Sequence, residues 1–473
     1  MKSIIMKELL KRITLTQVNV VIAIILFPLL SESEFTYAST RHKCVNVIKD
    51  ISFENQVNTP NTYYVIKDYI DLQGTTINIP SHSILKFEGG QLGNGTLVGA
   101  DTYIEAGVYT IFENDIILEG TYKASEAYPE WFESTDDAIK IREALEHFEN
   151  VKLTAKHYLL ESVNSDGYGV IIPSGHILQG NRCANNTMSD DQTIKLKNGI
   201  PYRAVVALSN NTILQNLTIR GDRQDNTSCV ATVKGFQSRL TIDRVGVSGS
   251  YYGFNLQTYL TNLVQCTANY NEIGFFIHGE ISGNTVSVEG TSINLNTCYA
   301  VDSKIAGYEL YGLTYSTMNN CAADGCGGPV SGELNNRSKV GYAYSLKQSK
   351  NITINSCGAE NCLAALITQN CKNLILNSPS FQINKRKDVK VATDYILKPI
   401  INIRYSAFIE LNYMFVNVSG MSKYYSNNSP LMLLYGSAHS LPSVIVKNGY
   451  EGIKYSNIGT EGFLSKEKNL IYE

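Results

Sequence analysis

The fold is decided by three short stretches of the sequence: LNTCYAV at Leu295–Val301, MNNCAAD at Met318–Asp324 and INSCGAE at Ile354–Glu360. Each stretch has an apolar residue, two polar residues, a cysteine, a variable residue, an alanine and a second variable residue. Such self-similarity within one chain is the signature of a repeat architecture.

The same pattern extends to both sides, and in three of these four further stretches another residue takes the place of cysteine. It recurs as LQNLTIR at Leu214–Arg220, IDRVGVS at Ile242–Ser248, LVQCTAN at Leu263–Asn269 and, less cleanly, LNSPSFQ at Leu376–Gln382. A second recurring signal pairs glycine with an aromatic residue. It is found at Gly253-Phe254, Gly274-Phe275, Gly307-Tyr308 and Gly341-Tyr342.

The spacing of these signals identifies the repeating unit. Gly253 and Gly274 are 21 residues apart, and Cys298 and Cys321 are 23 residues apart. Helical-hairpin repeats need more residues and a helical periodicity, which the segments lack. About three short strands joined by turns fit this length, and stacked coils of that kind form parallel sheets. The sequence therefore predicts an all-β protein, a single-stranded right-handed parallel β-helix with one short helix in its N-terminal half and terminal caps.

Regions of different texture divide the chain. We expect a signal peptide at residues 1–38, an N-terminal region of short β coils at 39–125 and a connecting segment at 126–150. The main β-helix is expected at 151–421, and a C-terminal cap at 422–473. The connecting segment holds the one good helix candidate, Ser134–Glu149, whose apolar stripe includes Ile139 and Leu145 and which Ser134 or Thr135 can cap.

The N-terminus has the features of an export signal. A basic region precedes the 13 apolar residues of Val18–Leu30, and small residues follow up to a plausible cleavage point after Ala38. An apolar stretch of this length is short for a membrane span, although an uncleaved anchor is the alternative. We therefore expect a secreted, periplasmic or cell-surface protein with no stable membrane insertion once the signal is removed.

Charge and cysteine usage exclude several classes of protein. The formal net charge is −3, and the one basic run, Lys385–Lys387, is too short for nucleic-acid binding, so no nucleic-acid partner is expected. The chain has 10 cysteines, but those in the repeats are expected to stack inward as small apolar residues. A disulfide between Cys326 and Cys362 is an alternative, because both follow the repeat cysteine by five residues.

Several stretches resemble the pectate-lyase-like superfamily of right-handed β-helix proteins, in the branch found in secreted proteins of gut Bacteroidetes and in phage tailspikes. The stretches that carry the resemblance are Ile79–Gly90, Asn94–Thr96, Tyr128–Phe132 (YPEWF), Asp136–Ile139, 320–323 and 356–359. The resemblance covers most of the chain after the signal. It implies the fold and a polysaccharide partner, while members of this type include lyases, hydrolases, epimerases and non-catalytic binders. One lyase family of gut Bacteroides that cuts glycosaminoglycans is similar in size and fold.

The last residue of each repeated strand defines a column on the outside of the expected coils. The column consists of Arg220, Ser248, Asn269, Val301, Asp324, Glu360 and Gln382. Asp324 and Glu360 would be neighbours on successive coils, with carboxyl groups on the order of 5 Å apart, the separation of a retaining glycosidase pair. This pattern predicts a glycoside hydrolase. The alternatives are two solvated carboxylates or two ligands of a shared cation such as Ca²⁺; no other cofactor is expected.

β-Elimination from a uronic-acid polymer, such as a glycosaminoglycan or pectin, is the reaction that we favour. It needs a base, an acid and a group that neutralises the substrate carboxylate, and tyrosine can serve as base or acid. The residues that we expect to take part in catalysis are Asp324, Glu360, Tyr299, Tyr315 and Tyr342. Those expected to bind substrate are Arg220, Asn269, Lys304, Tyr308, Arg337 and Tyr344.

Two further interpretations complete the set. His278 lies within a coil or two of these residues, but an isolated histidine is more often a turn residue than a catalyst. A non-catalytic glycan-binding surface protein is the hypothesis from a different functional class, because tyrosine-rich coils can contact sugars without cleaving them.

Overall fold

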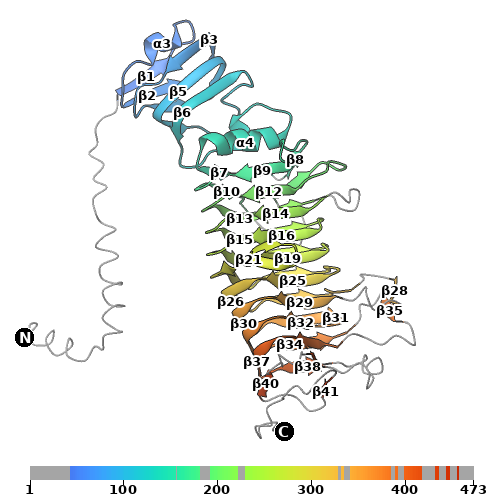
Figure 1. Cartoon of the computed structure of the whole chain (residues 1–473). Helices are drawn as coiled ribbons and strands as arrows, with labels where there is room; N and C mark the ends of the chain where they lie inside the picture. Colours follow the sequence, from blue (N-terminus) through green and yellow to red (C-terminus); the bar gives the residue numbers. More distant parts are fainter. Residues whose placement is uncertain are drawn as a thin grey trace, which may run out of the picture.

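The computed structural model shows an elongated molecule with a smaller sheet domain at one end (Figure 1). It describes residues 43–155, 157–181, 192–221, 229–328, 332–334, 341–384, 389–391, 399–417, 432–435, 444–447 and 455–457. The expected signal peptide, the basic run Lys385–Lys387 and Arg337 lie outside the described residues. Among those that are described, no helix is long and apolar enough to cross a membrane.

The N-terminal region forms a sheet of its own, in which all pairs of strands are parallel. Its strands are β1 (Lys43–Val47), β2 (Thr62–Ile66), β3 (Tyr69–Asn78), β4 (Ile84–Phe87), β5 (Gln91–Glu105) and β6 (Ile116–Lys123), with the short helix α3 (Phe53–Gln56) after β1. The short-coil texture of residues 63–122 thus corresponds to a separate parallel sheet at the start of the molecule.

A helix lies across the first coil of the main solenoid (Figure 1). It is α4 (Asp137–His147), preceded by the 3₁₀ turn η1 (Pro129–Trp131). The expected helix is present but shorter, and its cap is Asp136 rather than Ser134 or Thr135. The Asp136 carboxylate accepts a hydrogen bond from the backbone N–H of Ala138 at 2.8 Å. A carboxylate at this position satisfies an otherwise unpaired donor and faces the positive end of the helix dipole.

The main part of the chain is a right-handed parallel β-helix whose coils each contribute strands to three stacks, which we call faces 1, 2 and 3. Face 1 contains β7 (Asn150–Lys152), β10 (Ile177–Gln179), β13 (Ile213–Arg220), β15 (Thr241–Ser248), β17 (Asn262–Val264), β23 (Asn294–Asn296), β26 (Leu313–Asn319), β30 (Lys350–Asn355), β33 (Lys372–Asn377), β37 (Ala407–Asn412) and β40 (Val444–Lys447).

Face 2 continues each coil after a corner, and β13 and β15 run through both faces. Its other strands are β8 (His157–Leu160), β11 (Thr193–Leu196), β18 (Thr267–Asn269), β24 (Tyr299–Val301), β27 (Ala322–Asp324), β31 (Gly358–Cys362), β34 (Ser380–Ile383) and β38 (Phe415–Asn417). The short strand β22 (Gly290–Thr291) pairs with β26, and β28 (Gly332–Leu334) pairs with β35 (Val389–Val391).

Face 3 closes each coil. Its strands are β9 (Tyr168–Ile172), β12 (Ala204–Leu208), β14 (Ala231–Gly235), β16 (Tyr252–Gln257), β19 (Ile273–His278), β25 (Ala306–Tyr311), β29 (Tyr342–Lys347), β32 (Leu366–Gln369), β36 (Ile401–Arg404), β39 (Met432–Tyr435) and β41 (Tyr455–Asn457). Because β39, β40 and β41 pair with preceding coils, the stacked strands extend beyond residue 421, where a separate cap was expected.

The predicted ladder of small apolar residues forms the corner between faces 1 and 2. Its members are Leu217, Val245, Cys266, Cys298, Cys321 and Cys357, all buried. The residue before each cysteine turns the chain with a positive φ: Gln265 at 51°, Thr297 at 54°, Asn320 at 52° and Ser356 at 49°. This left-handed turn aims the following side chain into the core, so one inward residue is fixed in every coil.

An aromatic stack fills the core behind face 3. Its ring centroids are 5.0 Å apart for Phe254 and Phe275, 4.8 Å for Phe275 and Tyr308, and 5.1 Å for Tyr308 and Tyr344. These spacings match the distance between neighbouring strands, as in-register stacking requires. Tyr308 and Tyr344 are buried, and their hydroxyls contact backbone carbonyl oxygens of their own coil and of the next coil. The prediction that they bind substrate is therefore wrong, because both side chains belong to the core.

The glycine before each aromatic residue has a steric cause. A Cβ on Gly253 would lie 2.6 Å from the carbonyl oxygen of Gly274, and one on Gly274 would lie 2.7 Å from that of Gly307. The prediction that Gly341-Tyr342 is the equivalent of Gly307-Tyr308 is wrong by two residues, because Tyr308 pairs with Tyr344 and not with Tyr342. The extra residues of the preceding loop shift this strand, and Ala343 takes the place of glycine.

No disulfide joins the cysteines that the structure describes. Cys326 and Cys362, the pair considered for a disulfide, are both buried free thiols. Each donates to a carbonyl of the preceding coil, Ala300 for Cys326 at 3.5 Å and Ala323 for Cys362 at 3.6 Å. Burial raises the pKa of the Cys326 thiol to about 12, so it stays protonated. The side chains of Cys326 and Cys362 therefore pack in the apolar core.

A charge in the ladder should unfold the β-helix. Cys321→Asp places a carboxylate where neighbouring coils offer no cation, and we expect it to lower the free energy of unfolding by about 3 kcal/mol or more. Cys321→Ala should cost about 1 kcal/mol, because it removes only one buried atom. Urea denaturation followed by circular dichroism measures both. Equal stability of the two variants would contradict an inward ladder.

Thiol labelling provides an independent check of the core. Cys44 is exposed, whereas Cys266, Cys298, Cys321 and Cys357 are buried. We expect iodoacetamide to modify Cys44 in the native protein and the four ladder cysteines only in denaturant, as measured by peptide mass spectrometry. Labelling of the ladder at the native rate of Cys44 would be incompatible with this packing.

Candidate functional site

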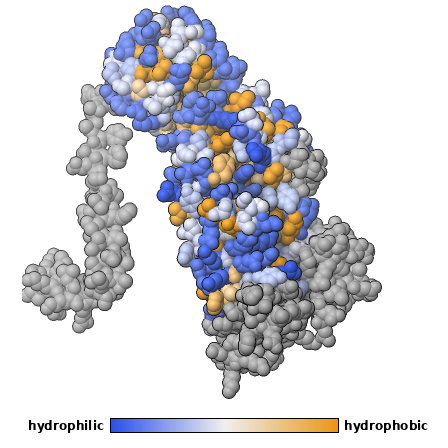
Figure 2. Space-filling model, viewed as in Figure 1, coloured by the Kyte–Doolittle hydropathy of each residue, from blue (hydrophilic) through white to orange (hydrophobic). Residues whose placement is uncertain are grey.

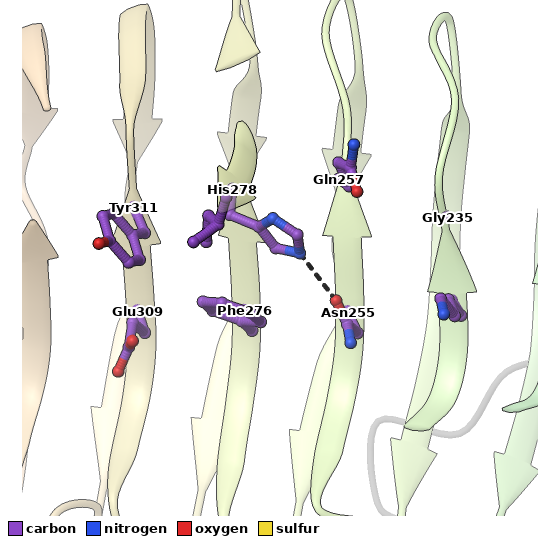
Figure 3. Close-up of a pocket in the computed structure, with 9 residues that line it drawn as sticks. Gly235, Asn255, Gln257, Phe276, His278, Glu309 and Tyr311 are labelled. Carbon is purple, nitrogen blue, oxygen red and sulfur yellow. Dashed lines mark hydrogen bonds between the residues drawn. The ribbon is translucent and has the colours of Figure 1, made fainter. Parts of the chain in front are cut away.

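A pocket lies on the outer surface of face 3, where the side chains that alternate with the core stack point outward. The row Lys234, Asn255, Phe276 and Glu309 runs across β14, β16, β19 and β25 in register. Two residues further along the strands, Gln257, His278 and Tyr311 form a second row. Figure 3 shows Asn255, Phe276 and Glu309 of the first row, and Gln257, His278 and Tyr311 of the second row, on adjacent strands.

A hairpin forms one wall of this pocket. It consists of β20 (Glu280–Ser282) and β21 (Thr285–Val288), inserted after β19. The Tyr311 hydroxyl and the Gln348 side-chain amide each donate to the carbonyl of Asn284 at 2.7 Å, which ties the hairpin to the next two coils. Ile281 reaches into the pocket. The pocket is open to solvent and has a volume of about 380 Å³, within the roughly 300–1,000 Å³ typical of small-molecule sites.

His278 is a buried titratable group in the pocket wall, with 9% of its surface exposed. Its ring stacks on Phe276 with centroids 4.3 Å apart, and its Nδ1 lies 2.6 Å from the carbonyl oxygen of Gly279. Since a carbonyl only accepts, Nδ1 carries the proton. Burial lowers the pKa of His278. The hydrogen bond to Gly279 raises this pKa and the positive charge of Lys234 lowers it, so the net shift is downward. The imidazole is therefore held neutral with its lone pair on Nε2.

Asn255 holds this tautomer from the neighbouring strand. Its side-chain carbonyl position lies 3.0 Å from Nε2 of His278. A neutral ring protonated at Nδ1 can only accept at Nε2, so we assign the amide NH₂ of Asn255 to face it. Nε2 is therefore the acceptor of the histidine, and in this structure the Asn255 amide occupies it at the edge of the pocket.

Charged groups flank the histidine on both sides. Lys234 forms no ion pair with any residue that the structure describes. Burial is the main cause that lowers the pKa of Lys234, and the positive charge of nearby Arg203 is the second. Glu309, only 8% exposed, instead accepts from Lys347 at 2.8 Å. Desolvated, uncompensated lysines attract anions strongly, because water competes less for them. The pocket thus presents a neutral base beside a cation that an acidic ligand could pair with.

Aromatic surface completes the site. Tyr252 stacks on Phe276 with ring centroids 4.9 Å apart and planes at 19°. Both rings are half-buried and lie outside the main core. Flat aromatic faces of this kind pack well against the apolar face of a sugar ring. Elsewhere on the side of the molecule seen in Figure 2, hydrophobic residues occur in scattered groups among hydrophilic ones.

The predicted column on face 2 is confirmed as a register. Arg220, Ser248, Asn269, Val301, Asp324, Glu360 and Gln382 pair one after another across successive strands. Asp324 and Glu360 are therefore direct neighbours. Tyr299 lies beside them and donates to Oδ2 of Asp324 at 3.4 Å, while Asn361 donates to Oδ1 at 2.9 Å. Burial, then the charges of Asp324 and Glu360, raise the pKa of Tyr299 to about 12, so this phenol keeps its proton.

The remaining predicted site residues are not brought together with this group. Tyr315 is 68% exposed on face 1. Tyr342 is buried on face 3, where its hydroxyl accepts from Asn402 at 3.1 Å. Lys304 pairs with Glu272 at 3.0 Å, and Asn269 is buried at the end of β18. Tyrosines scattered over three faces cannot act on one bond, so the tyrosine set does not form a single site.

Asp324 and Glu360 alone supply fewer oxygens than a Ca²⁺ site needs, and the expected Ca²⁺ site stays a prediction. Calcium takes six to eight oxygens, and both oxygens of Asp324 already accept hydrogen bonds from Tyr299 and Asn361. Among the described residues, the only group of three possible metal ligands within reach of one another is Glu143, Glu146 and His147 on α4. That group lies on the helix, away from both candidate sites.

Sequence reasoning did not assign the face 3 pocket. His278 was set aside as a turn residue, yet it is the last residue of β19. The available signal was alternation: Phe275 and Ile277 point inward in the strand that carries the recurring Gly-aromatic pair, so Phe276 and His278 must point outward. The wall hairpin directly follows β19 in the chain, whereas Lys234 comes from another coil, and its proximity to His278 required the register of face 3.

Comparisons find similarity in the path of the chain. No family model matches the sequence, and no curated protein matches it. Similar solved structures include the gp42 tailspike of Acinetobacter phage vb_AbaP_AS12, with a TM-score of 0.47 and 14% identity over 71% of this chain and 61% of the tailspike. Tailspike protein 2 of Escherichia coli O157:H7 bacteriophage CAB120 aligns with a TM-score of 0.48 and 13% identity over 68% of this chain and 42% of its own.

The A-module of the Azotobacter vinelandii mannuronan C-5 epimerase AlgE4 aligns with a TM-score of 0.44 and 14% identity, over 70% of this chain and 96% of the module. This chain thus spans less than two thirds of either tailspike but nearly the whole epimerase module. At such identities the likeness concerns fold alone, and the expected membership of the pectate-lyase-like superfamily stays a prediction.

The charge state of His278 can be measured directly. Because its pKa in the folded protein lies below the ordinary 6.5, we expect its NMR titration at lower pH than that of exposed histidines. Because of the same shift, His278 contributes to the stability of the folded protein above pH 6.5. This contribution is lost as the pH falls through the pKa that His278 has in the folded protein. Comparison of histidine-labelled wild type with His278→Gln assigns the signal. Titration at or above 6.5 would contradict the burial seen here.

Proposed function

We propose that the protein cleaves a uronic-acid-containing polysaccharide, such as a glycosaminoglycan or pectin, by β-elimination in the face 3 pocket. The observation that carries this proposal is the combination of a neutral, buried His278 with the uncompensated cation Lys234 in one pocket. A base and a carboxylate-neutralising group are the two requirements of the first step of elimination. Export to the cell exterior, predicted from residues 1–38, is part of the same proposal.

In the first step, the substrate displaces the Asn255 amide from Nε2 of His278, and Nε2 then removes the proton on C5 of the uronate. That proton is weakly acidic, and its loss places negative charge on the neighbouring carboxylate. Lys234 pairs with the carboxylate and stabilises the charge as it develops, which lowers the barrier more than it strengthens ground-state binding. A neutral imidazole suits this role, because a protonated ring could not accept.

In the second step, the electron pair of the broken C5–H bond forms a double bond between C4 and C5, and the C4–O bond breaks. The leaving oxygen takes a proton from Tyr311, whose Cα is the register partner of His278 on the next strand, after the Tyr311 hydroxyl turns away from the Asn284 carbonyl to which it donates in the absence of substrate. The tyrosinate then regains a proton from the His278 imidazolium. Both residues end in their starting states, and the products are a shortened chain and an unsaturated sugar.

The Asp324 and Glu360 pair supports a second candidate, glycoside hydrolysis on face 2. Neighbouring strands place equivalent positions about 4.8 Å apart, which is close to the spacing of a retaining carboxylate pair. The register between β27 and β31 favours this alternative. Both Asp324 oxygens, however, accept hydrogen bonds from protein groups. We therefore rank hydrolysis below elimination.

Variants in the pocket test the proposal. His278→Gln removes the base and should lower kcat about 10²- to 10⁴-fold, and Lys234→Met should lower kcat/KM about a hundredfold. Asp324→Asn and Glu360→Gln are matched controls on face 2 and should leave elimination unchanged. The readout is the ultraviolet absorbance of the new C4–C5 double bond on acidic polysaccharides.

Other outcomes of the same assay identify the alternatives. New reducing ends without ultraviolet absorbance, lost in Asp324→Asn and Glu360→Gln, would indicate the hydrolase. Binding of every polymer without product would indicate a non-catalytic glycan binder. Unchanged elimination in His278→Gln would remove the pocket from the reaction.

A further inference from the structure

Face 3 continues beyond the pocket toward the C-terminal end of the β-helix (Figure 1). The outward row that contains His278 and Tyr311 extends in register through Lys347 on β29, Gln369 on β32 and Arg404 on β36. Residues that alternate with this row, such as Leu346 and Ile403, are buried in the core. The row is therefore a continuous line of polar and aromatic side chains parallel to the axis.

Arg404 is held in position by a chain of two hydrogen bonds. Asn402, only 1% exposed, donates through Nδ2 to the Tyr342 hydroxyl at 3.1 Å. Its Oδ1 accepts from Nε of Arg404 at 3.2 Å. A buried amide anchored in this way fixes one edge of the guanidinium group, and the rest of the side chain is exposed. A preorganised arginine loses little rotamer freedom when it binds an anion.

Arg404 and Lys347 differ in their charged partners among the residues that the structure describes. Lys347 is neutralised by Glu309 at 2.8 Å, and Gln369 carries no charge. No carboxylate of the described residues pairs with Arg404. Along the outer surface of face 3, Lys234 and Arg404 are thus positive groups on either side of a neutral stretch. Four strand spacings separate His278 from Arg404, about 19 Å at roughly 4.8 Å each.

We propose that Arg404 forms a distal subsite that binds the acidic group of a second sugar in the same polymer. Guanidinium groups recognise carboxylates and sulfate esters through paired hydrogen bonds. The spacing means that the bound sugar is several units from the bond at His278, so the substrate is a linear acidic chain lying parallel to the helix axis. This inference rests on the proposed function, because it takes the face 3 pocket as the reaction centre.

Chain length provides the test of this subsite with a built-in control. Arg404→Ala should raise KM about tenfold for long acidic oligosaccharides, consistent with the loss of one charge-assisted contact, and leave kcat unchanged. Disaccharides and trisaccharides cannot reach from the pocket to Arg404, so their KM should not change. Lys372→Ala is the matched control, because it removes a positive charge from face 1 of a nearby coil. An equal KM change for short and long chains would overturn the subsite.

A binding measurement separates failure of this inference from failure of the proposed function. Full-length protein carrying His278→Gln, with and without Arg404→Ala, is titrated calorimetrically with polygalacturonate and with chondroitin sulfate. We expect Arg404→Ala to weaken binding of at least one polymer about tenfold, whether or not the wild type cleaves it. Equal affinity of the two proteins, or no binding to either polymer, would contradict the subsite. Absence of cleavage with weakened binding would contradict only the elimination.

Discussion

The register between successive coils is the constraint on which the whole molecule depends. Each coil turns at a residue with positive φ and then buries one small side chain, and this corner sets how the next strand aligns. A slip of one residue would move every inward side chain to the surface and every outward one into the core. Cys298, Cys321 and Cys357 specify that alignment from face 1 to face 2. The stack from Phe254 to Tyr344 specifies it on face 3.

The function-bearing surface is a consequence of the same register. Once Phe275 and Ile277 are fixed inward, Phe276 and His278 must project outward, beside Asn255 of one coil and Tyr311 of another. Residues separated by 20 or more positions in sequence thus meet without any local motif. The wall hairpin modifies this regular surface, because it closes one side of a groove that would otherwise be open. We infer that the regular coils and the inserted hairpin together form a site that stays open on one side.

The fold could be predicted from sequence to a large extent, and the site could not. The Cys-x-Ala repeats, the column from Arg220 to Gln382 and the helix near residue 140 reflect one-dimensional periodicity, which the chain itself displays. The tyrosines were harder to place, because a tyrosine can line a core as readily as a surface. Tyr308 and Tyr344 can be buried because their hydroxyls donate to backbone carbonyl oxygens. No sequence pattern predicts which carbonyls these are. The shifted strand at Gly341 arises from a loop whose length the repeat does not determine.

The central claim is that an acidic polysaccharide binds along the outer surface of face 3 with its reacting sugar at His278. A crystal structure of the His278→Gln variant soaked with an acidic oligosaccharide of eight or more units, a length of about four strand spacings or longer, tests it most directly. We predict density for the sugar chain parallel to the axis, with a carboxylate at Lys234 and an acidic group at Arg404. A chain bound instead across face 2, against Asp324 and Glu360, would contradict the account.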